Sequence, residues 1–205
     1  MVIAIDGPAG AGKSTVARAV AERLGFTYLD TGAMYRCVGL AAQRSDEPAA
    51  ALAKRMEIQL GAQVLLDGED VTKTIREPGV SEAASRVAAD PEVREALVGK
   101  QRQIMKSGDW VAEGRDIGSV VAPDAAVKVF LHAHPEERAR RRASQIGLDV
   151  QEVLNRQRTR DTRDSSAGRA TLEPHEGAIE LDTTELTLEA VIDKIVALAH
   201  EAQEA

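Results

Sequence analysis

The first fourteen residues contain the side chains whose types and spacing most directly indicate chemistry. The run from Gly7 to Ser14 is Gly-Pro-Ala-Gly-Ala-Gly-Lys-Ser, which fits the pattern G-x-x-x-x-G-K-S. Glycines permit torsions that turn successive N–H groups into one concavity, and such a concavity binds phosphate. Lys13 would reach the β- and γ-phosphates of a nucleoside triphosphate, and the Ser14 hydroxyl would hold Mg²⁺. The expected triphosphate contacts are Gly7, Pro8, Ala9, Gly10, Ala11, Gly12, Lys13, Ser14 and Thr15.

The segments on either side of this loop predict a strand before it and a helix after it. Residues 2–6 are mostly apolar, and Val16, Val20 and Leu24 recur at helical spacing. A strand–loop–helix context is the one in which this pattern forms a P-loop. A plain glycine turn that opens a helix is the alternative interpretation.

Length and composition limit the remaining possibilities. The chain has 205 residues, a formal net charge of −7, one cysteine and 2% aromatic residues. The length suits one α/β domain with a small insertion. The negative charge and the scarcity of aromatic side chains argue against a nucleic-acid partner. With the motif starting at residue 7 and no long apolar run, we expect no signal peptide, no membrane partner and a cytoplasmic location.

The rest of the sequence predicts strands that alternate with helices. Such an order gives a doubly wound, parallel sheet of five strands flanked by helices. We expect these strands at 2–6, 26–30, 110–113, 126–131 and 178–181. Short β-like runs at 57–71 indicate an insertion outside the main sheet. Thr31 is expected to cap the helix that follows the second strand.

An arginine-rich segment lies between Arg138 and Arg169. It has nine arginines and no lysine, although the chain as a whole is acidic. A solvated helix face is one interpretation of this charge. The other is a mobile flap that clamps phosphate oxygens, because the arginine fork suits bidentate contacts.

Several runs together resemble the bacterial cytidylate kinase family. They are Ile5-Asp-Gly-Pro-Ala-Gly-Ala-Gly-Lys-Ser14, Leu29-Asp-Thr-Gly-Ala-Met-Tyr-Arg36, Gly68-Glu-Asp-Val71, Val87-Ala-Ala-Asp-Pro-Glu-Val-Arg94, Glu113-Gly-Arg-Asp-Ile-Gly118 and Leu181-Asp-Thr-Thr184. The likeness implies one P-loop NTPase domain over residues 1–205. Within it, the likeness implies a nucleoside-monophosphate-binding subdomain at about 45–105, with its β insertion at about 57–71, and a short lid at about 145–170.

The resemblance also implies site residues. Ser85, Arg94 and Asp116 resemble residues that recognise cytosine. Arg36 and Arg115 resemble those that hold the acceptor phosphate, and Thr31 lines the same site. Arg160 and Asp164 resemble the pair near the acceptor ribose.

The chemistry of cytosine agrees with this set. A carboxylate such as Asp116 can accept from the N4 amine, and an arginine such as Arg94 can donate to the ring acceptors. Each residue also has an alternative interpretation without a role in binding. Asp116 could form a salt bridge with Arg115, Arg94 could be a surface residue, and Ser85 could be an ordinary small residue of a helix. Asp30 could order Mg²⁺ through water, or simply cap a helix.

The sequence departs from the family pattern after Asp164. The family typically continues S-x-R-x-x-x-P-L, but here Ala167 stands at the arginine position and Thr171 at the proline position. We expect Arg169 to reach the acceptor phosphate instead, because Gly168 gives the backbone freedom to turn it inward. A solvated loop arginine is the alternative.

The resemblance implies an ATP-dependent kinase that uses Mg²⁺ and phosphorylates CMP and dCMP in pyrimidine nucleotide metabolism, with Lys13, Arg36, Arg115 and Arg160 as catalytic residues. We expect a monomer. Two alternatives are another P-loop kinase, acting on UMP, AMP or a metabolite such as shikimate, and a GTPase switch. The motif N-K-x-D that reads guanine in such switches is missing, because the single asparagine, Asn155, precedes Arg156.

Overall fold

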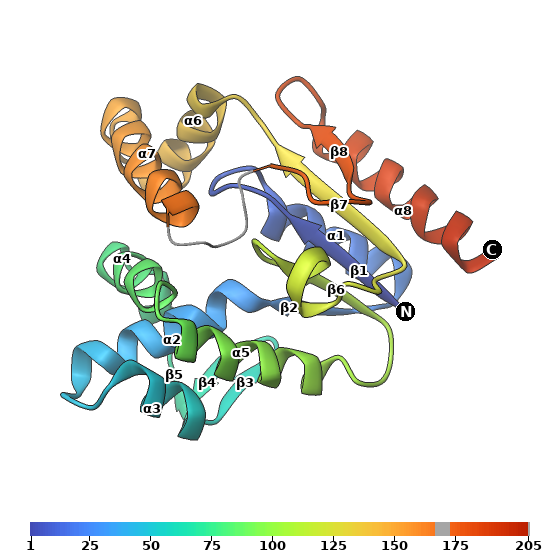
Figure 1. Ribbon diagram of the computed structural model, residues 1–205. Coiled ribbons are helices and arrows are strands. Elements are labelled where there is room, and N and C mark those ends of the chain that lie inside the picture. Colours follow the sequence, from blue (N-terminus) through green and yellow to red (C-terminus); the bar gives the residue numbers. More distant parts are fainter. Residues whose placement is uncertain (167–172, 205) are drawn as a thin grey trace. The chain divides into compact units, whose positions relative to one another are not determined.

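The structure is a computed structural model that describes residues 1–166 and 173–204, without the side chains of residues 163–166. Strands and helices alternate along the chain (Figure 1). The strands are β1 (Val2–Asp6), β2 (Thr27–Asp30), β3 (Ile58–Leu60), β4 (Val64–Leu66), β5 (Glu69–Asp70), β6 (Trp110–Glu113), β7 (Val127–His132) and β8 (Ile179–Asp182). The α-helices are α1 (Lys13–Leu24), α2 (Thr31–Arg44), α3 (Ala49–Arg55), α4 (Pro78–Val87), α5 (Pro91–Ile104), α6 (Pro135–Ile146), α7 (Val150–Ser166) and α8 (Leu188–Glu204). A 3₁₀ turn, η1 (Thr74–Arg76), and a π-helical turn, η2 (Ile117–Val121), complete the set.

The main sheet confirms the predicted fold class. Its five strands run in the order β2-β6-β1-β7-β8, so the first strand lies at the centre. Strand β1 pairs in parallel with both β6 and β7, and β7 pairs in parallel with β8. In a sheet of this kind, ligands bind at the carboxyl ends of the strands, where the strand order reverses. The loop that follows β1 lies at that point.

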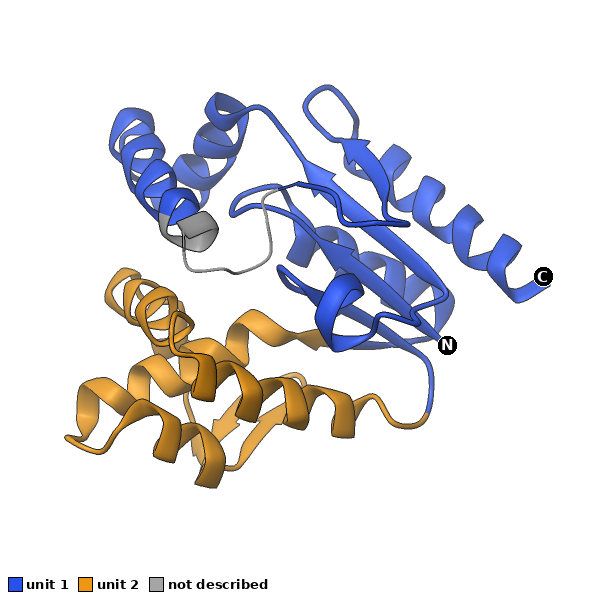
Figure 2. Ribbon diagram, viewed as in Figure 1, with its two compact units in different colours: residues 1–28, 108–205 blue, residues 29–107 orange. Residues whose placement is uncertain are grey.

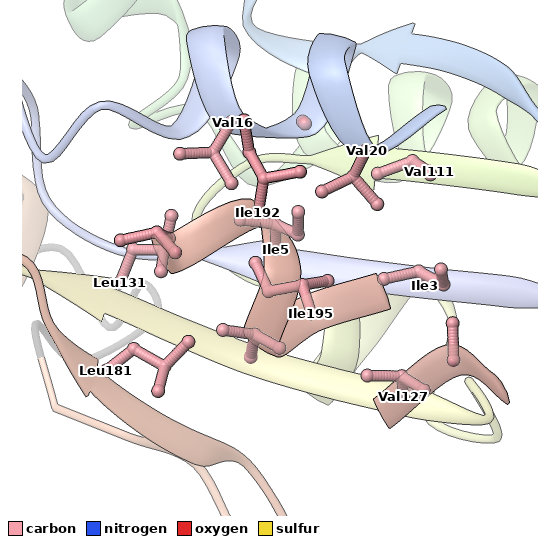
Figure 3. Packing of buried hydrophobic residues seen from close by; sticks show 14 of the residues in the cluster. Ile3, Ile5, Val16, Val20, Val111, Val127, Leu131, Leu181, Ile192 and Ile195 are labelled. Atoms are coloured by element: carbon pink, nitrogen blue, oxygen red, sulfur yellow. The ribbon is translucent and has the colours of Figure 1, made fainter. Parts of the chain in front are cut away.

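One face of this sheet carries an aliphatic core. Ile3 and Ile5 of β1 alternate with Ala4 and Asp6, as the two-residue period of a strand requires. Figure 3 shows the two isoleucines packed with side chains from α1, α8 and the neighbouring strands. The labelled members of this cluster are Ile3, Ile5, Val16, Val20, Val111, Val127, Leu131, Leu181, Ile192 and Ile195. The same alternation turns Asp6 toward the opposite face.

The chain divides into two compact units (Figure 2). The first contains residues 1–28 and 108–205, and the second contains residues 29–107. The second unit holds α2 to α5 and the antiparallel sheet β3-β4-β5. Its core is separately aliphatic and includes Met34, Leu52, Ile75 and Leu97. The β-like runs expected as an insertion therefore form a sheet of their own.

Helix α2 begins differently from the prediction. Thr31 is its first residue, and the cap is Asp30, whose Oδ1 accepts a hydrogen bond from the Ala33 N–H at 2.8 Å. Aspartate is as good a capping residue as threonine, and here it ends the preceding strand. The expectation that Thr31 caps this helix was wrong by one residue. No helix in the described part of the chain is long and apolar enough to cross a membrane.

Candidate functional site: a phosphate-binding loop among buried charges

The loop between β1 and α1 adopts a conformation that needs its glycines. Gly7, Gly10 and Gly12 have φ values of 145°, 80° and 91°, in the region that side chains disfavour. Gly12 caps α1 without any side-chain hydrogen bond, so the first N–H groups of the helix are available to an anion. Ser14 and Thr15 are exposed in the first turn. This geometry suits the polyphosphate site predicted from the sequence.

Gly7 lies against the backbone of strand β7. A Cβ built at this position would stand 1.9 Å from the carbonyl oxygen of Leu131. No side chain of any size fits there, because backbone on both sides would have to move. The loop therefore starts at a point fixed by the sheet.

Asp6 ties the loop to the segment after β6. Its carboxylate is fully buried and accepts hydrogen bonds from the Ile117 and Gly118 N–H groups, both at 2.8 Å. These two N–H groups belong to the first turn of η2, directly after Arg115 and Asp116. His175 adds an ion pair, with Nε2 3.4 Å from Oδ2 of Asp6. The buried carboxylate of Asp6 thus fixes the position of the backbone directly after Arg115 and Asp116, two of the residues expected to bind the acceptor.

Lys13 lies among several charges of the first unit. Its Nζ donates to the carbonyl oxygen of Pro8 at 2.9 Å. Desolvation, together with the cations Arg115 and Arg160, lowers the pKa of Lys13 to about 7, although the carboxylates Glu113 and Asp6 oppose this shift. Two of the other predicted catalytic residues, Arg115 and Arg160, therefore lie close enough to Lys13 for their charges to act on it. Three cations at one loop form a site that a polyanion would stabilise.

Arg115 contacts the loop directly. Its Nη1 donates to the carbonyl oxygen of Gly7 at 2.7 Å. The neighbouring Asp116 is 6% exposed, and its backbone carbonyl receives the N–H groups of Val120 and Val121. Asp116 is therefore a buried carboxylate directly beside the arginine that contacts the loop.

Glu113 is a buried carboxylate to which the sequence analysis assigned no role. It ends β6, is 4% exposed, and its Oε1 accepts the Tyr28 hydroxyl hydrogen at 2.6 Å. Its charge raises the pKa of Lys13. An acid that closes an otherwise apolar strand was the sequence signal that could have identified it.

In the second unit, Asp30 and Arg36 form a pair at the start of α2. Arg36 Nη2 donates to Asp30 Oδ2 at 2.8 Å, and Arg76 Nη2 stands 3.9 Å from the same oxygen. Asp30 also caps the helix, so the capping alternative is the one observed. Thr31 is 3% exposed beside it.

Ser85 and Arg94 lie on two different helices of the same unit. Ser85 is buried on α4, at 4% exposure, and Arg94 is half-buried on α5. A Cβ built at Gly39 on α2 would stand 2.7 Å from the Ala84 N–H nitrogen. The missing side chain therefore lets α2 and α4 approach closely, and this approach positions Ser85.

Within the arginine-rich segment, the interpretation as a solvated helix face holds for Arg140 but not for Arg138. Arg140 is a solvated residue with 70% of its side chain exposed, whereas Arg138 is buried and contacts the phosphate-binding loop. Arg160 lies on α7, and Asp164 lies on the same helix beyond the residues with described side chains. Arg169 and Ala167 fall outside the described residues, so the expectation for Arg169 stays a prediction.

A magnesium ion fits the donors present. Among the described residues, no cluster of three or more His, Cys, Asp or Glu side chains could hold a metal alone. Mg²⁺ typically takes one or two protein oxygens together with substrate phosphates and water. Ser14 and a carboxylate near the loop would meet that need.

The chain is similar in sequence to a family of known proteins. The family model described as Cytidylate kinase matches residues 3–201. A cytidylate kinase from Caldanaerobacter subterraneus subsp. tengcongensis is 50% identical over 205 aligned residues, which cover 94% of this chain and 92% of the relative. A cytidylate kinase from Desulfitobacterium hafniense is 46% identical over 217 residues, which cover 98% and 94%.

Solved structures show a shared fold at much lower identity. A gluconokinase from Sinorhizobium meliloti 1021 aligns with a TM-score of 0.57 and 17% identity, over 99% of this chain and 94% of that chain. A shikimate kinase from Bacteroides thetaiotaomicron aligns with a TM-score of 0.52 and 16% identity, over 100% and 99%.

Proposed function

The chain belongs to the cytidylate kinase family, and from this premise we infer that it transfers the γ-phosphoryl group of ATP to CMP. It is a phosphotransferase of the nucleoside monophosphate kinase type. We include dCMP as a second acceptor in the proposal. The family match disfavours the UMP, AMP and metabolite kinases and the GTPase switch that the sequence left as alternatives.

The observation that carries the proposal is the set of cations around the glycine loop. Lys13 and Arg115 donate hydrogen bonds to the carbonyl oxygens of Pro8 and Gly7 in the loop, and the charges of Arg115 and Arg160 both lower the pKa of Lys13. Such a cluster is costly without an anion and favourable with one. The charge that spreads over a transferring phosphoryl group is the kind of charge that it would stabilise.

The chemistry needs little from a general base. The acceptor phosphate of a nucleoside monophosphate is largely ionised at neutral pH. One of its oxygens would attack the γ-phosphorus in line, and the bond from that phosphorus to the β,γ-bridging oxygen would break to release ADP. Lys13 would hold the β- and γ-phosphates, and the arginines would meet the developing charge.

The acceptor residues that the family resemblance implies are kept as proposals, and each is named within its own unit. In the second unit, Thr31 and Arg36 would hold the 5′-phosphate, and Ser85 and Arg94 would contact the cytosine ring. In the first unit, the proposed acceptor residues are Arg115, Asp116, Arg160, Asp164 and Arg169. Support comes from the burial of Ser85 and Asp116, because a buried polar group left unpaired by the wrong base costs affinity.

Mg²⁺ belongs to the proposal as well. Ser14 would hold it directly, and Glu113 or Asp30 would orient its water ligands. Glu113 is supported by its place in the first unit beside Lys13, whereas both carboxylate oxygens of Asp30 already accept hydrogen bonds. When bound, the ion would neutralise charge on the triphosphate oxygens.

The experiment is an ADP-release assay with ATP against CMP, dCMP, UMP, AMP and GMP. We expect CMP and dCMP to be preferred. The Asp116→Ala variant should lower kcat/KM for CMP by on the order of 10²-fold, because the cytosine N4 amine loses a charged partner. The KM for ATP should change little.

A matched control is Asp124→Ala, which removes an exposed aspartate downstream of η2. It should behave as the wild type. Turnover of UMP or AMP above that of CMP would contradict the proposed acceptor, and equal losses for ATP and CMP in Asp116→Ala would assign Asp116 a structural role.

A further inference from the structure

Arg138 of helix α6 reaches the phosphate-binding loop from a buried position. Its side chain is 8% exposed, and Nη1 donates both to the carbonyl oxygen of Ala9 and to Oδ2 of Asp161, each at 2.9 Å. Its Nε donates to the carbonyl oxygen of Ala133 at 3.2 Å. One guanidinium thus connects the loop, the end of β7 and helix α7.

Gln157 brings a second contact between α7 and the loop. It lies one helical turn before Asp161, so both side chains project from the same face of α7. Its Nε2 donates to the Arg138 carbonyl oxygen at 3.3 Å. A Cβ built at Gly10 would stand 2.7 Å from this nitrogen, so the amide lies directly against the loop. The Gln157 Oε1 is buried and has no hydrogen-bond partner among the described residues.

The ion pair between Arg138 of α6 and Asp161 of α7 is not needed to hold these two helices together. Helices α6 and α7 already share an apolar cluster of their own, made of Ala139, Ala143, Val153 and Leu154. A buried ion pair adds little stability over apolar side chains of the same volume. The pair between Arg138 and Asp161 is therefore better explained by the geometry it imposes than by the stability it adds.

The ion pair affects the position of Arg160. This arginine directly precedes Asp161 on α7, and its charge acts on Lys13. A shift of α7 along the loop would move Arg160 relative to Lys13. Because a misplacement of about 1 Å can cost on the order of 10²-fold in rate, the register of α7 matters for transfer.

We propose that Arg138 and Gln157 are positioning residues that fix α7 against Ala9 and Gly10 of the loop and thereby place Arg160 for phosphoryl transfer. The proposal rests on the proposed role of Arg160 in catalysis. Arg138 and Gln157 act through that residue and need no contact with either substrate. Their contribution should therefore appear in kcat and should vanish when Arg160 is absent.

The test is a double-mutant cycle between Arg138→Lys and Arg160→Ala. Lysine keeps the charge of Arg138 but cannot donate to Ala9, Ala133 and Asp161 together. In the wild-type background, we expect Arg138→Lys to lower kcat about 10- to 100-fold, with both KM values within about twofold. In the Arg160→Ala background, the same change should lower kcat less than about twofold.

Two further variants separate positioning from folding. Gln157→Leu keeps the volume and should lower kcat in the same direction with an unchanged melting temperature. Arg156→Gln, on the exposed side of the same helix, removes only a surface pair with Glu152 and should leave kcat unchanged.

The outcomes decide between the alternatives. Independent, multiplicative losses for Arg138→Lys and Arg160→Ala would overturn the proposal, as would a loss of kcat that tracks the loss of melting temperature across the variants. The cycle uses whichever acceptor the wild type phosphorylates fastest. A wrong assignment of the acceptor would therefore appear when the wild type is assayed with the five monophosphates. The double-mutant cycle could still be interpreted in that case.

Discussion

The two halves of the phosphate-binding loop are held in different ways. The first half, Asp6 and Gly7, is held mainly by backbone, namely the N–H groups of Ile117 and Gly118 and the carbonyl of Leu131, with side-chain contacts from Arg115 and His175 in addition. The second half, Ala9 and Gly10, meets long side chains that come from α6 and α7. Backbone atoms inside a packed sheet cannot move aside for an added group, whereas side chains can change rotamer.

The contrast suggests a division of labour within one loop. The first half gives the site a fixed origin relative to the sheet, where Lys13 and Arg115 are anchored to Pro8 and Gly7. The second half connects the loop, through the side chains of Arg138 and Gln157, to the helix that carries Arg160. Substitutions in the first half should therefore mainly cost stability, and those in the second half should be tolerated better by the fold.

The largest effect is expected for Gly7→Ala. The added Cβ would stand 1.9 Å from the Leu131 carbonyl oxygen, so strand β7 or the loop must shift. We expect the free energy of unfolding to fall by about 3–5 kcal/mol, the range of severe core disruptions. Denaturant unfolding measures it. Gly25→Ala is the control, because Gly25 has φ 69° and nothing within 4 Å; it should cost only about 1–2 kcal/mol. Equal losses of unfolding free energy for Gly7→Ala and Gly25→Ala would show that the clash with Leu131 adds nothing to the backbone strain.

A smaller effect is expected for Gly10→Ala, in the second half of the loop. Its Cβ would meet the Gln157 amide at 2.7 Å and the Arg138 carbonyl oxygen at 3.1 Å, and the amide can rotate away. The loss should be about 1–2 kcal/mol, mostly from the φ of 80°. Gly12→Ala has a similar φ of 91° with nothing within 4 Å, and should cost nearly as much. A loss at Gly10 as large as at Gly7 would show that the second half is as rigid as the first.

The smallest effect concerns His175 and the first half of the loop. Its interaction with Asp6 raises the pKa of His175, although burial and Lys128 oppose the rise. A raised folded-state pKa adds stability that is fully present below the unfolded value of about 6.5 and is lost as the pH rises through the folded value. His175→Ala should therefore cost more stability at pH 6 than at pH 8, by less than about 1 kcal/mol.

Unfolding at the two pH values tests this, with the exposed His200→Ala on α8 as the control. A cost that does not depend on pH would mean that Asp6 is held by the two N–H groups alone.

Local patterns predicted the structure around the loop well, because the residues concerned are neighbours in the sequence. The loop, the helix that follows it and the five strands all depend on spacings of a few residues, and the structure shows each of them. The cap of α2 was missed by one position because both Asp30 and Thr31 can cap, and only the end of the strand decides between them. Glu113 received no role because its importance depends on which strand lies beside β1.

The sequence by itself determined that a glycine loop would join a strand to a helix, that strands would be separated by helices, and that arginines would gather between Arg138 and Arg169. The tertiary structure decided which of those arginines meets the loop. Arg138 contacts Ala9 across 129 positions of the chain, and Asp6 contacts Ile117 across 111. Periodicity reports only on neighbours within a few turns. Contacts between distant segments depend on the order of strands in the sheet, which the packing of the whole core selects.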